Sequence, residues 1–503
     1  PLLCMVSCVL ACPMMCFQNY GIPAIHSGSL LGKIEGESNL LNFSDFKLSK
    51  YNFFMQNESM AMIFYNHLYK QLCKFPAEYY ERIQKCLLET QKGTAANVDD
   101  LAVFQELRRR NAILPLNFDE EAVSNLHYMN EITKDSLCLI IYPTLACNFR
   151  CPYCYQSHKN NNMDAETATG IISYVRKNIS KYRELHVAWF GGEPLLKLDL
   201  IQQMSSAFID ICHKRNRLYT SAITTNGYFM NKDVFLKLYS NNVRKFAVTI
   251  DGLAEIHDRQ RITVDGKGSF NKIISNLLEI KSISSNLKFE MNIRSNVSKE
   301  GLQRLEPYVK YMSELFDDDD RFCFSFRPVY DWGGDSIQSF RDHLLDDFVG
   351  CKNLYDFLYV LDYPMNYYQH YEEITNSSIC YASREHTFAV EPDGRLSKCT
   401  SANRESENYF VGAIDKFGNM QLDKNLVAQW ANPYHDKASC KDCFFEASCH
   451  SNFCVLDKVL MNSRKTKCPG GKMYIKEYIK LLDKNNDRYH YIEEVNMEQP
   501  NEY

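Results

Sequence analysis

The 503-residue chain has no run of about 20 apolar residues, which is the length that a membrane-spanning helix needs. It also has no excess of basic residues, because 57 lysines and arginines stand against 62 aspartates and glutamates, a net charge of −5. These two absences argue against a membrane protein and against a nucleic-acid partner. No internal repeat or long low-complexity tract occurs, and a hydrophobic content of 45% suffices for the cores of two or three domains.

Cysteine, by contrast, is abundant, with 20 residues that group at short spacings. In a chain of this size, such spacing is typical of metal or cluster sites in a reducing compartment, not of a disulfide scaffold. The first group comprises Cys147, Cys151 and Cys154, and it follows the apolar run Leu139–Tyr142. Three thiolates can bind three irons of a [4Fe–4S] cluster and leave the fourth iron open to another ligand. A zinc loop or three buried thiols are the alternatives.

Further motifs stand at the ends of predicted strands. The apolar run at 185–190 ends in Gly191, Gly192 and Glu193, where glycine permits a close approach of the backbone to a ligand and a carboxylate can bind an ammonium group. Strands are also predicted before residues 226 and 251, at 289–297 and at 322–328, with helices at 198–214 and 270–283. This alternation predicts parallel βα units that collect ligands at the carboxyl ends of their strands.

Together these motifs resemble the radical SAM family, over roughly residues 45–475. The resemblance implies an α/β fold with a partial (β/α)6 barrel, whose three-cysteine loop holds one [4Fe–4S] cluster. It also implies S-adenosylmethionine as a cofactor, with contacts from Gly191, Gly192, Glu193, Thr249, Asp251 and Arg294. From the residues alone, Thr249 and Asp251 could instead end a strand and cap a helix, and Arg294 could be a solvated strand residue.

A second set of cysteines occupies the C-terminal third, and its order resembles the SPASM extension of radical SAM enzymes. That extension carries two auxiliary [4Fe–4S] clusters. The resemblance assigns the outer cluster to Cys440, Cys443, Cys449 and Cys468, and the inner one to Cys380, Cys399 and Cys454, with His386 as a candidate further ligand. Cys449 and Cys454 are separated by four residues, where the family usually has three. A pair of zinc knuckles is the alternative.

We predict six segments. They are a leader of unknown role (1–43), an N-terminal α+β, winged-helix-like module (44–130), the barrel (131–337), a helical bridge (338–375), the SPASM domain (376–475) and a tail (476–503). In the leader, Cys4, Cys8, Cys12 and Cys16 stand at every fourth position, and no function is assigned to them. The acidic run at 317–320 is expected to be a solvated loop.

The N-terminal module combines predicted strands at 50–55 and 60–65 with helices at 77–90 and 98–109 and a short strand at 113–114. It resembles the precursor-recognition element of peptide-modifying radical SAM proteins, which adds a peptide strand to a sheet edge. A simple brace on the barrel is the alternative.

The resemblance implies a cytoplasmic, anaerobic enzyme that abstracts a hydrogen atom from a ribosomally made peptide and forms an oxidative cross-link. Its partners would be the peptide or protein substrate and a reductant such as flavodoxin or ferredoxin. The nearest alternative is an anaerobic sulfatase maturase, which forms formylglycine. Those enzymes have a catalytic aspartate directly after the cysteine that matches Cys399, whereas this chain has Thr400, which cannot act as a carboxylate base. A non-catalytic, metal-containing peptide-binding protein is the alternative from another class.

Overall fold

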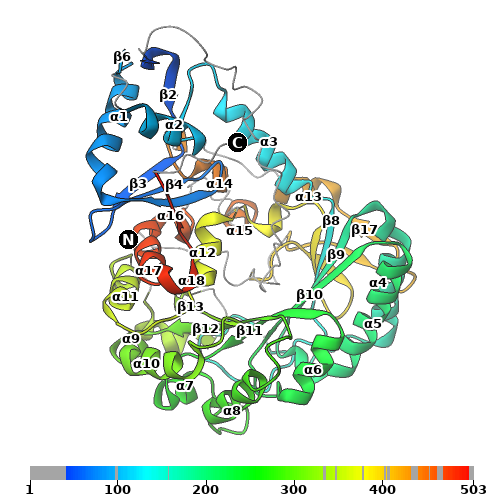
Figure 1. Cartoon of the computed structure of the whole chain (residues 1–503). Helices are drawn as coiled ribbons and strands as arrows, with labels where there is room; N and C mark the ends of the chain where they lie inside the picture. Colours follow the sequence, from blue (N-terminus) through cyan, green and yellow to red (C-terminus); the bar gives the residue numbers. More distant parts are fainter. Residues whose placement is uncertain are drawn as a thin grey trace.

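The computed structural model describes most of the chain from residue 41 to residue 497 (Figure 1). The predicted leader therefore lies almost wholly outside the described residues, as do its four cysteines. Within that range the description omits residues 94, 97–99, 157, 332–335, 346–347, 377–378, 402–403, 405–407, 432–439, 452–453 and 461–467. In the part of the chain that is described, no helix is both long enough and apolar enough to cross a membrane.

The centre of the molecule is a ten-stranded sheet in the order β13-β12-β11-β10-β9-β8-β14-β15-β16-β17. Seven neighbouring strands, from β13 to β14, pair in parallel. The six barrel strands are β8 (Ser136–Ile141), β9 (Glu184–Trp189), β10 (Leu218–Thr225), β11 (Val243–Thr249), β12 (Glu290–Val297) and β13 (Phe322–Pro328). The predicted α/β class and parallel barrel are thereby confirmed.

Helices cover the outer side of this curved sheet (Figure 1). They are α4 (Ala165–Asn178), α5 (Leu198–Lys214), α6 (Lys232–Ser240), α7 (Ala254–Gln260), α8 (Phe270–Lys281), α9 (Lys299–Gln303) and α10 (Leu305–Phe316). Apolar residues recur along α5 at helical spacing, and Ile201, Met204 and Phe208 are fully buried. Strands β9 and β13 are buried on both faces along almost their whole length, as expected for parallel strands between two layers. Both periodicities are visible in the sequence, which explains why α5 and β13 were predicted at their observed bounds.

The sheet continues past the barrel into the cysteine-rich region. Strand β14 (Thr387–Val390) pairs in parallel with β8, and β15 (Arg395–Ser397), β16 (Phe410–Ile414) and β17 (Met420–Leu422) follow as antiparallel strands. The predicted boundary at residue 376 therefore does not coincide with a break in the sheet. The bridge contains α11 (Phe348–Val360) and α12 (Tyr368–Thr375), and the C-terminal helices are α13 (Lys424–Ala431), α14 (Glu446–Cys449), α15 (Val455–Val459), α16 (Gly470–Met473), α17 (Ile475–Lys484) and α18 (Asn486–Tyr489).

The N-terminal module has its own four-stranded sheet in the order β18-β5-β4-β3. Strands β3 (Asn52–Gln56), β4 (Met62–Asn66) and β5 (Gln71–Phe75) are antiparallel, and β18 (Glu493–Glu494) comes from the far end of the chain. Strands β1 (Leu41–Asn42) and β6 (Ala95–Ala96) form one small pair, and β2 (Phe46–Leu48) and β7 (Ile113–Pro115) another. The module's helices are α1 (Tyr80–Lys92), α2 (Leu101–Arg109) and α3 (Glu120–Ile132). Strands β5 and β18 and helix α3 were not predicted from the sequence.

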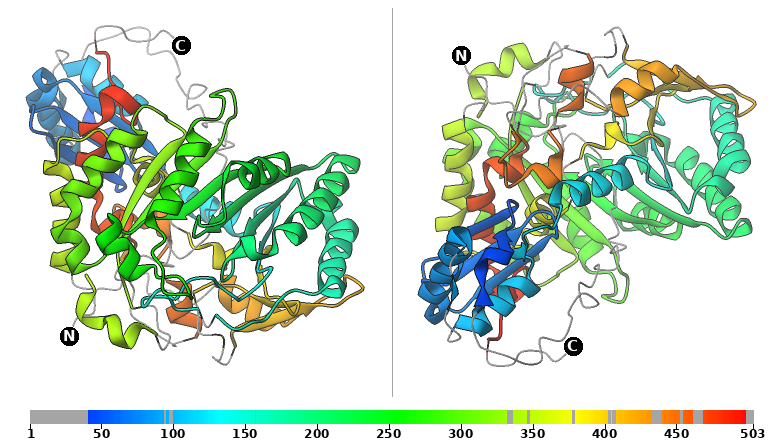
Figure 2. Two further views of the ribbon diagram at one scale, coloured as in Figure 1. Left: turned by 90° about the horizontal axis from the view of Figure 1, so that it is seen from below. Right: turned by 90° about the horizontal axis from the view of Figure 1, so that it is seen from above.

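The views in Figure 2 place this module against the C-terminal helices, on the side of the molecule away from β15–β17. Direct contacts join the two. The Tyr51 hydroxyl donates to Glu446 Oε2 at 3.1 Å, and the Phe53 ring lies 5.3 Å from that of Phe444.

The described 3₁₀ helices are Phe43–Asp45, Ala77–Tyr79, Ile179–Lys181, Pro194–Lys197, Ser336–His343 and Tyr381–Ser383.

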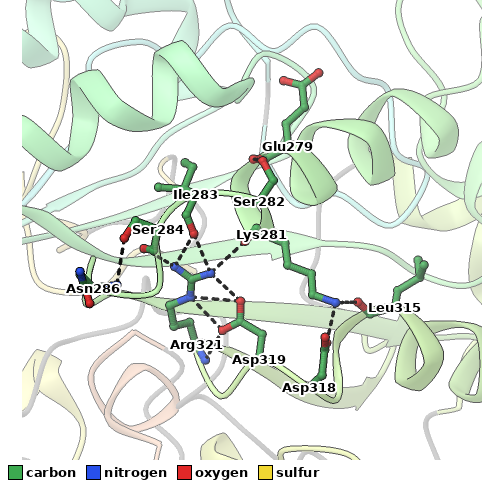
Figure 3. Close-up of polar contacts among 10 residues, drawn as sticks. All are labelled: Glu279, Lys281, Ser282, Ile283, Ser284, Asn286, Leu315, Asp318, Asp319 and Arg321. Atoms are coloured by element: carbon green, nitrogen blue, oxygen red, sulfur yellow. Dashed lines mark hydrogen bonds and ion pairs between the residues drawn. The ribbon is translucent and has the colours of Figure 1, made fainter.

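The acidic run at 317–320 corrects one expectation, because its first three carboxylates are paired and not simply solvated. Asp319 accepts from Arg321 Nη2 at 2.6 Å, Asp318 lies 2.5 Å from Lys281 Nζ, and Asp317 lies 3.1 Å from Arg488. Arg321 also donates to the main-chain oxygens of residues 281, 283 and 284 (Figure 3). This network ties the loop before β13 to the end of α8.

Candidate active site

The three-cysteine loop begins six residues after Ile141, the last residue of β8, at the carboxyl edge of the parallel sheet. Its backbone is held by the segment that follows α7. The Arg150 amide donates to the Ile262 oxygen at 2.8 Å, and the Val264 amide donates to the Asn148 oxygen at 2.9 Å. The Cys154 amide donates to the Cys151 oxygen at 3.1 Å and closes a turn between two of the cysteines. The loop is therefore fixed by its own turns and by one neighbouring segment.

The thiols of this loop lie close enough to influence one another electrostatically. Burial raises the pKa of Cys147 and Cys151 to about 12 and that of Cys154 to about 11. The Phe149 amide donates to Cys147 Sγ at 3.4 Å. Because burial disfavours isolated thiolates here, a bound cation would have to compensate for three negative charges.

Gly191 and Gly192 press against the chain segment that leads into the cysteine loop. A Cβ atom added at Gly191 would lie 2.3 Å from the Thr144 oxygen, and one at Gly192 would lie 2.1 Å from the Ala146 oxygen. The Gly192 amide donates to the Thr144 oxygen at 3.1 Å, and the Glu193 amide donates to the Ala146 oxygen at 2.8 Å. The two glycines therefore allow close contact with the protein's own backbone at residues 144–146. This contact positions Cys147, which follows directly.

The Glu193 carboxylate is fully buried between the ends of β9 and β10. Its Oε1 accepts from the Thr225 hydroxyl at 2.7 Å and from the Leu195 amide at 3.0 Å, and its Oε2 accepts from the Asn226 amide at 2.7 Å. Burial raises the pKa of Glu193, and these donors oppose that shift. Asn226 in turn donates to Asn148 Oδ1 at 2.7 Å. Glu193 is therefore connected to the cysteine loop through one intervening side chain.

Asp251, just beyond β11, takes part in a buried network that the analysis of the sequence did not anticipate. It accepts hydrogen bonds from the Tyr153 hydroxyl and, at 2.9 Å, from the Asn296 amide. Arg261 Nη1 donates to the Tyr153 hydroxyl at 2.9 Å. Burial raises the pKa of Asp251, and the charge of Arg261 opposes the shift. Tyr153 lies between Cys151 and Cys154, and this position in the sequence could have indicated that it belongs to the site.

Two other predicted cofactor contacts lie nearby. Thr249 is the last residue of β11 and is partly buried. Arg294, on the neighbouring strand β12, donates from Nε to Asn296 Oδ1 at 3.0 Å. Burial and the nearby Arg327 lower the pKa of Arg294 to about 10. The structure thus brings Arg294, Asn296 and Asp251 together at the carboxyl ends of β11 and β12.

The C-terminal cysteines form two groups in the described part of the chain. Cys449 is close enough to Cys440, Cys443 and Cys468 for their charges to raise its pKa further, after the effect of burial. Cys380 and Cys399 are also close enough for their charges to interact. Burial raises the pKa of Cys380 to about 12, and the charge of Cys399 adds to this shift. Lys472, which sequence reasoning missed, donates to Cys468 Sγ at 3.5 Å. These groups coincide with the predicted outer set and with two of the three inner residues.

Two predicted inner-site residues stand apart from this arrangement. The sulfur of Cys454 is in a disulfide bond in this structure, so it is not a free thiol here. The His386 ring packs 5.0 Å from that of Tyr182 and lies near Glu385. Their assignment to an inner cluster remains a prediction.

The family comparison decides the identity of the barrel. Residues 141–303 match the Radical SAM superfamily, and this segment contains the cysteine loop, Glu193, Asp251 and Arg294. This part of the chain is a radical SAM domain. Membership implies S-adenosylmethionine and a [4Fe–4S] cluster as cofactors, which confirms the family, the enzyme class and these two cofactors as predicted.

Sulfatase maturases are among its relatives. The cysteine-type anaerobic sulfatase-maturating enzyme of Clostridium novyi (strain NT) is 27% identical over 355 residues, which cover 63% of this chain and 87% of that enzyme. The corresponding enzyme of Clostridium perfringens (strain ATCC 13124) is 25% identical over 231 residues, 44% of this chain and 60% of that enzyme. A solved structure of native anSMEcpe with bound AdoMet and Cp18Cys peptide has a TM-score of 0.51 at 21% identity, and covers 70% of this chain and 97% of that one. This structural likeness supports the same fold.

The residues of this radical SAM domain fit both cofactors. Among the described residues, no three metal-binding side chains converge as they would on a single ion. The three thiols of the loop are neighbours whose charges interact, and attachment to three separate irons does not require them to converge on one point. Tyr142 Oη, Gln156 Oε1 and Thr224 Oγ1 are buried without a hydrogen-bond partner in the described part of the chain. A polar cofactor at this edge of the sheet would supply such partners.

Proposed function

We propose that this enzyme modifies a ribosomally made peptide, and that it forms an oxidative cross-link after hydrogen abstraction. The observation that carries the proposal is the gathering of two further thiol groups, of which Cys380 and Cys399 flank strands β14 and β15 of the sheet that bears the cysteine loop. When bound, the [4Fe–4S] cluster and S-adenosylmethionine supply the radical chemistry that breaks a carbon–hydrogen bond. Cys147, Cys151 and Cys154 would hold that cluster.

The protein's own residues would hold the cofactor and exclude water. Glu193 would orient the S-adenosylmethionine ammonium group, and Arg294 would face its carboxylate, since each lies at the carboxyl end of a strand beside the loop. Gly191 and Gly192 would keep the loop in place. Thr249 and Asp251 would lie near the ribose, with Tyr153 and Asn296 fixing the Asp251 carboxylate.

A cross-link needs an electron acceptor as well as a radical source. Forming one new bond removes two hydrogen atoms from the peptide, one by abstraction and one as a proton with an electron. The outer thiol group (Cys440, Cys443, Cys449 and Cys468) and the inner group (Cys380, Cys399 and, once its disulfide bond is reduced, Cys454) would hold two auxiliary [4Fe–4S] clusters that accept this electron. Strand β14 pairs in parallel with β8; Cys380 precedes β14 and Cys147 follows β8, so the two sites lie toward opposite ends of adjacent strands.

Sulfatase maturation is the second candidate, because relatives that bear that name cover much of the chain. Position 400 argues against it. Thr400 is fully buried, its hydroxyl lies 2.9 Å from the Tyr381 hydroxyl, and its amide donates to that hydroxyl at 2.8 Å. A neutral hydroxyl in this position cannot replace a carboxylate base at neutral pH.

Mass spectrometry of reacted peptides separates the two candidates. The reconstituted enzyme is incubated with S-adenosylmethionine, a reductant and either the short peptide encoded beside its gene or a sulfatase peptide that contains the modifiable cysteine or serine. We expect the first peptide to lose two hydrogen atoms per turnover and to give a fragmentation gap that spans the linked residues. An aldehyde that reacts with a hydrazine probe, formed in the sulfatase peptide alone, would contradict the proposal and favour formylglycine formation.

A further inference from the structure

An arginine is buried beside the three-cysteine loop, on the connection between α7 and α8 (residues 261–269). Phe149 of the loop and Thr263 of this connection form an antiparallel β-bridge. Arg261, two residues before the bridge, is only 7% exposed, and its guanidinium carbon lies 5.5 Å from the centre of the Phe149 ring. Because arginine remains protonated in proteins, a permanent positive charge lies next to the loop.

Arg261 has few polar partners for a buried arginine. Its Nη1 donates to the Tyr153 hydroxyl at 2.9 Å, and its Nε is buried without a hydrogen-bond partner. Within the described ranges, no carboxylate forms a direct ion pair with it. Its charge meets that of Asp251 through the Tyr153 hydroxyl, which donates to the Asp251 carboxylate. Because buried charges are normally paired, Arg261 is able to balance a further anion in this site.

The backbone that carries Arg261 is fixed by the residues around it. The Asp251 amide donates to His257 Nδ1 at 3.2 Å, which leaves His257 Nε2 to donate to Ser269 Oγ at 3.0 Å. The Ser269 hydroxyl then donates to the Arg261 oxygen at 2.9 Å. Asp258 Oδ1 accepts from the Ser269 amide at 2.7 Å. These bonds hold Arg261 in position independently of any ligand, so its charge is preorganised.

The charge of Arg261 acts on every cysteine of the loop. Burial raises the pKa of all three thiols, and Arg261 opposes each of these shifts. For Cys151 it is the largest effect after burial. Arg261 also opposes the rise in the pKa of Glu193. It therefore favours the thiolate form of the loop, which is the form that binds a metal.

Two other arginines near the loop do not have such a position. Arg150 is exposed, and its Nη1 donates to two main-chain oxygens of its own loop, at 2.8 and 2.7 Å. Arg259 is exposed as well, and its Nε donates to a main-chain oxygen of its own helix at 2.6 Å. Charges in solvent are screened by water and salt, whereas a buried charge is screened much less. A cluster at the loop would therefore sense the charge of Arg261 more strongly than either of these.

A [4Fe–4S] cluster at this loop would bring negative charge into a buried site. The three thiolates contribute three negative charges, and one-electron reduction adds another. Net charge and hydrogen bonding set the reduction potential of such clusters. A fixed positive charge nearby stabilises the reduced form more than the oxidised form, because the attraction grows with the added electron. Removal of that charge should make reduction harder.

We propose that Arg261 is the counter-charge of the radical-site cluster, a positioning residue that helps the three cysteines to retain the cluster and raises its reduction potential. The proposal rests on the cluster that we assign to Cys147, Cys151 and Cys154. It does not depend on the cross-link proposed for the peptide, because a reduction potential is measured without any substrate.

Anaerobic redox titrations of the full reconstituted chain test this role. Electron paramagnetic resonance follows the reduced clusters, and the signal that changes when S-adenosylmethionine is added identifies the radical-site cluster. In Arg261→Gln, we expect the ratio of reduced to oxidised cluster at a fixed potential to fall at least about ten-fold, a shift of about 59 mV to more negative values. Arg261→Lys keeps the charge and should recover most of this difference.

Two further variants separate the charge of Arg261 from its other contacts. Arg259→Gln removes an equal charge two residues away at the surface, and the ratio should not change. Tyr153→Phe removes the hydrogen bond of Arg261 Nη1 and keeps the charge, so its shift should be smaller than that of Arg261→Gln. A shift as large in Tyr153→Phe would assign the effect to the hydrogen bond and overturn the proposal.

Iron analysis of the same samples shows whether each variant retains the cluster. Loss of about four irons from folded Arg261→Gln, with full retention by Arg261→Lys, would also support the counter-charge. An unchanged potential in Arg261→Gln, or equal losses in the two Arg261 variants, would overturn it. A ratio about ten-fold lower in Arg261→Lys would do so even if Arg261→Gln failed to fold. None of these results alters the mass-spectrometric test of the peptide product, so the two proposals fail separately.

Discussion

The Asn226 amide donates a 2.7 Å hydrogen bond to Glu193 Oε2, and this bond joins the ends of β9 and β10 beside the cysteine loop. Three donors converge on the Glu193 carboxylate, which explains how a fully buried acid whose pKa is raised by burial is accommodated. The same carboxylate is the predicted partner of the S-adenosylmethionine ammonium group. Its structural and binding roles can be measured separately in one variant.

Replacing Glu193 with glutamine should weaken both roles. The NH₂ group of glutamine would face a hydrogen-bond donor that the Glu193 carboxylate now accepts from. We therefore expect a loss of about 1–3 kcal/mol in the free energy of unfolding. Affinity for S-adenosylmethionine should fall by at least about ten-fold, because the ion pair with the ammonium is lost. Denaturant unfolding and equilibrium dialysis measure the two effects. Glu255→Gln, on an exposed position of α7, is the matched control and should change neither.

Gly192→Ala should disturb the cysteine loop. The new Cβ would lie 2.1 Å from the Ala146 oxygen, so the segment before Cys147 must move. We expect a sharp loss of iron at the radical site after anaerobic reconstitution. Gly301→Ala is the control, because the atom nearest to its new Cβ would be the Ser298 side-chain oxygen, at 3.3 Å. Equal iron content in the two variants would show that the glycine does not position the loop.

Glu372 on α12 should make stability depend on pH. Burial raises its pKa to about 7, and Lys245, at 3.6 Å, opposes the shift while Glu290 adds to it. A raised carboxyl pKa contributes stability below the unfolded-state value of about 4.5, and this contribution is lost as the pH rises to about 7. We expect Glu372→Gln to flatten the fall in the free energy of unfolding across this window, by up to about 3 kcal/mol. Parallel pH profiles for the two proteins would contradict this assignment.

Cys443→Ala tests the outer thiol group. If Cys440, Cys443, Cys449 and Cys468 hold one cluster, the variant should lose about four irons and its peptide product, yet still cleave S-adenosylmethionine. Iron analysis and chromatography of 5′-deoxyadenosine measure both properties. Cys212→Ala, in α5 and outside every predicted cluster, is the control. Full turnover without Cys443 would show that the outer group is not needed.

The barrel could be predicted from sequence because its signals are local. The periodicity of α5 and the apolar runs of β9 and β13 mark these elements directly, and the motif residues stand at strand ends. Short spacings likewise identified the cysteine loop and most of the grouped C-terminal cysteines.

The remaining features depend on contacts between distant parts of the chain. The sequence does not show that β14 joins β8, because β14 is a four-residue strand and its partner lies more than 240 residues earlier. The contact of Arg110 with Glu493 spans 383 positions, and neither residue belongs to a recognisable motif. The contacts of Tyr153 with Asp251 and with Arg261 exist only in the folded barrel. Pairings of this kind are set by tertiary packing.

The most direct test of the account is anaerobic reconstitution, followed by a reductant and S-adenosylmethionine, with iron and 5′-deoxyadenosine measured on the same sample. We predict about twelve irons per chain and release of 5′-deoxyadenosine by the unaltered enzyme. The variant in which Cys147, Cys151 and Cys154 are all replaced by alanine should keep about eight irons and release none. Continued 5′-deoxyadenosine release by that variant would contradict the assignment of the radical site.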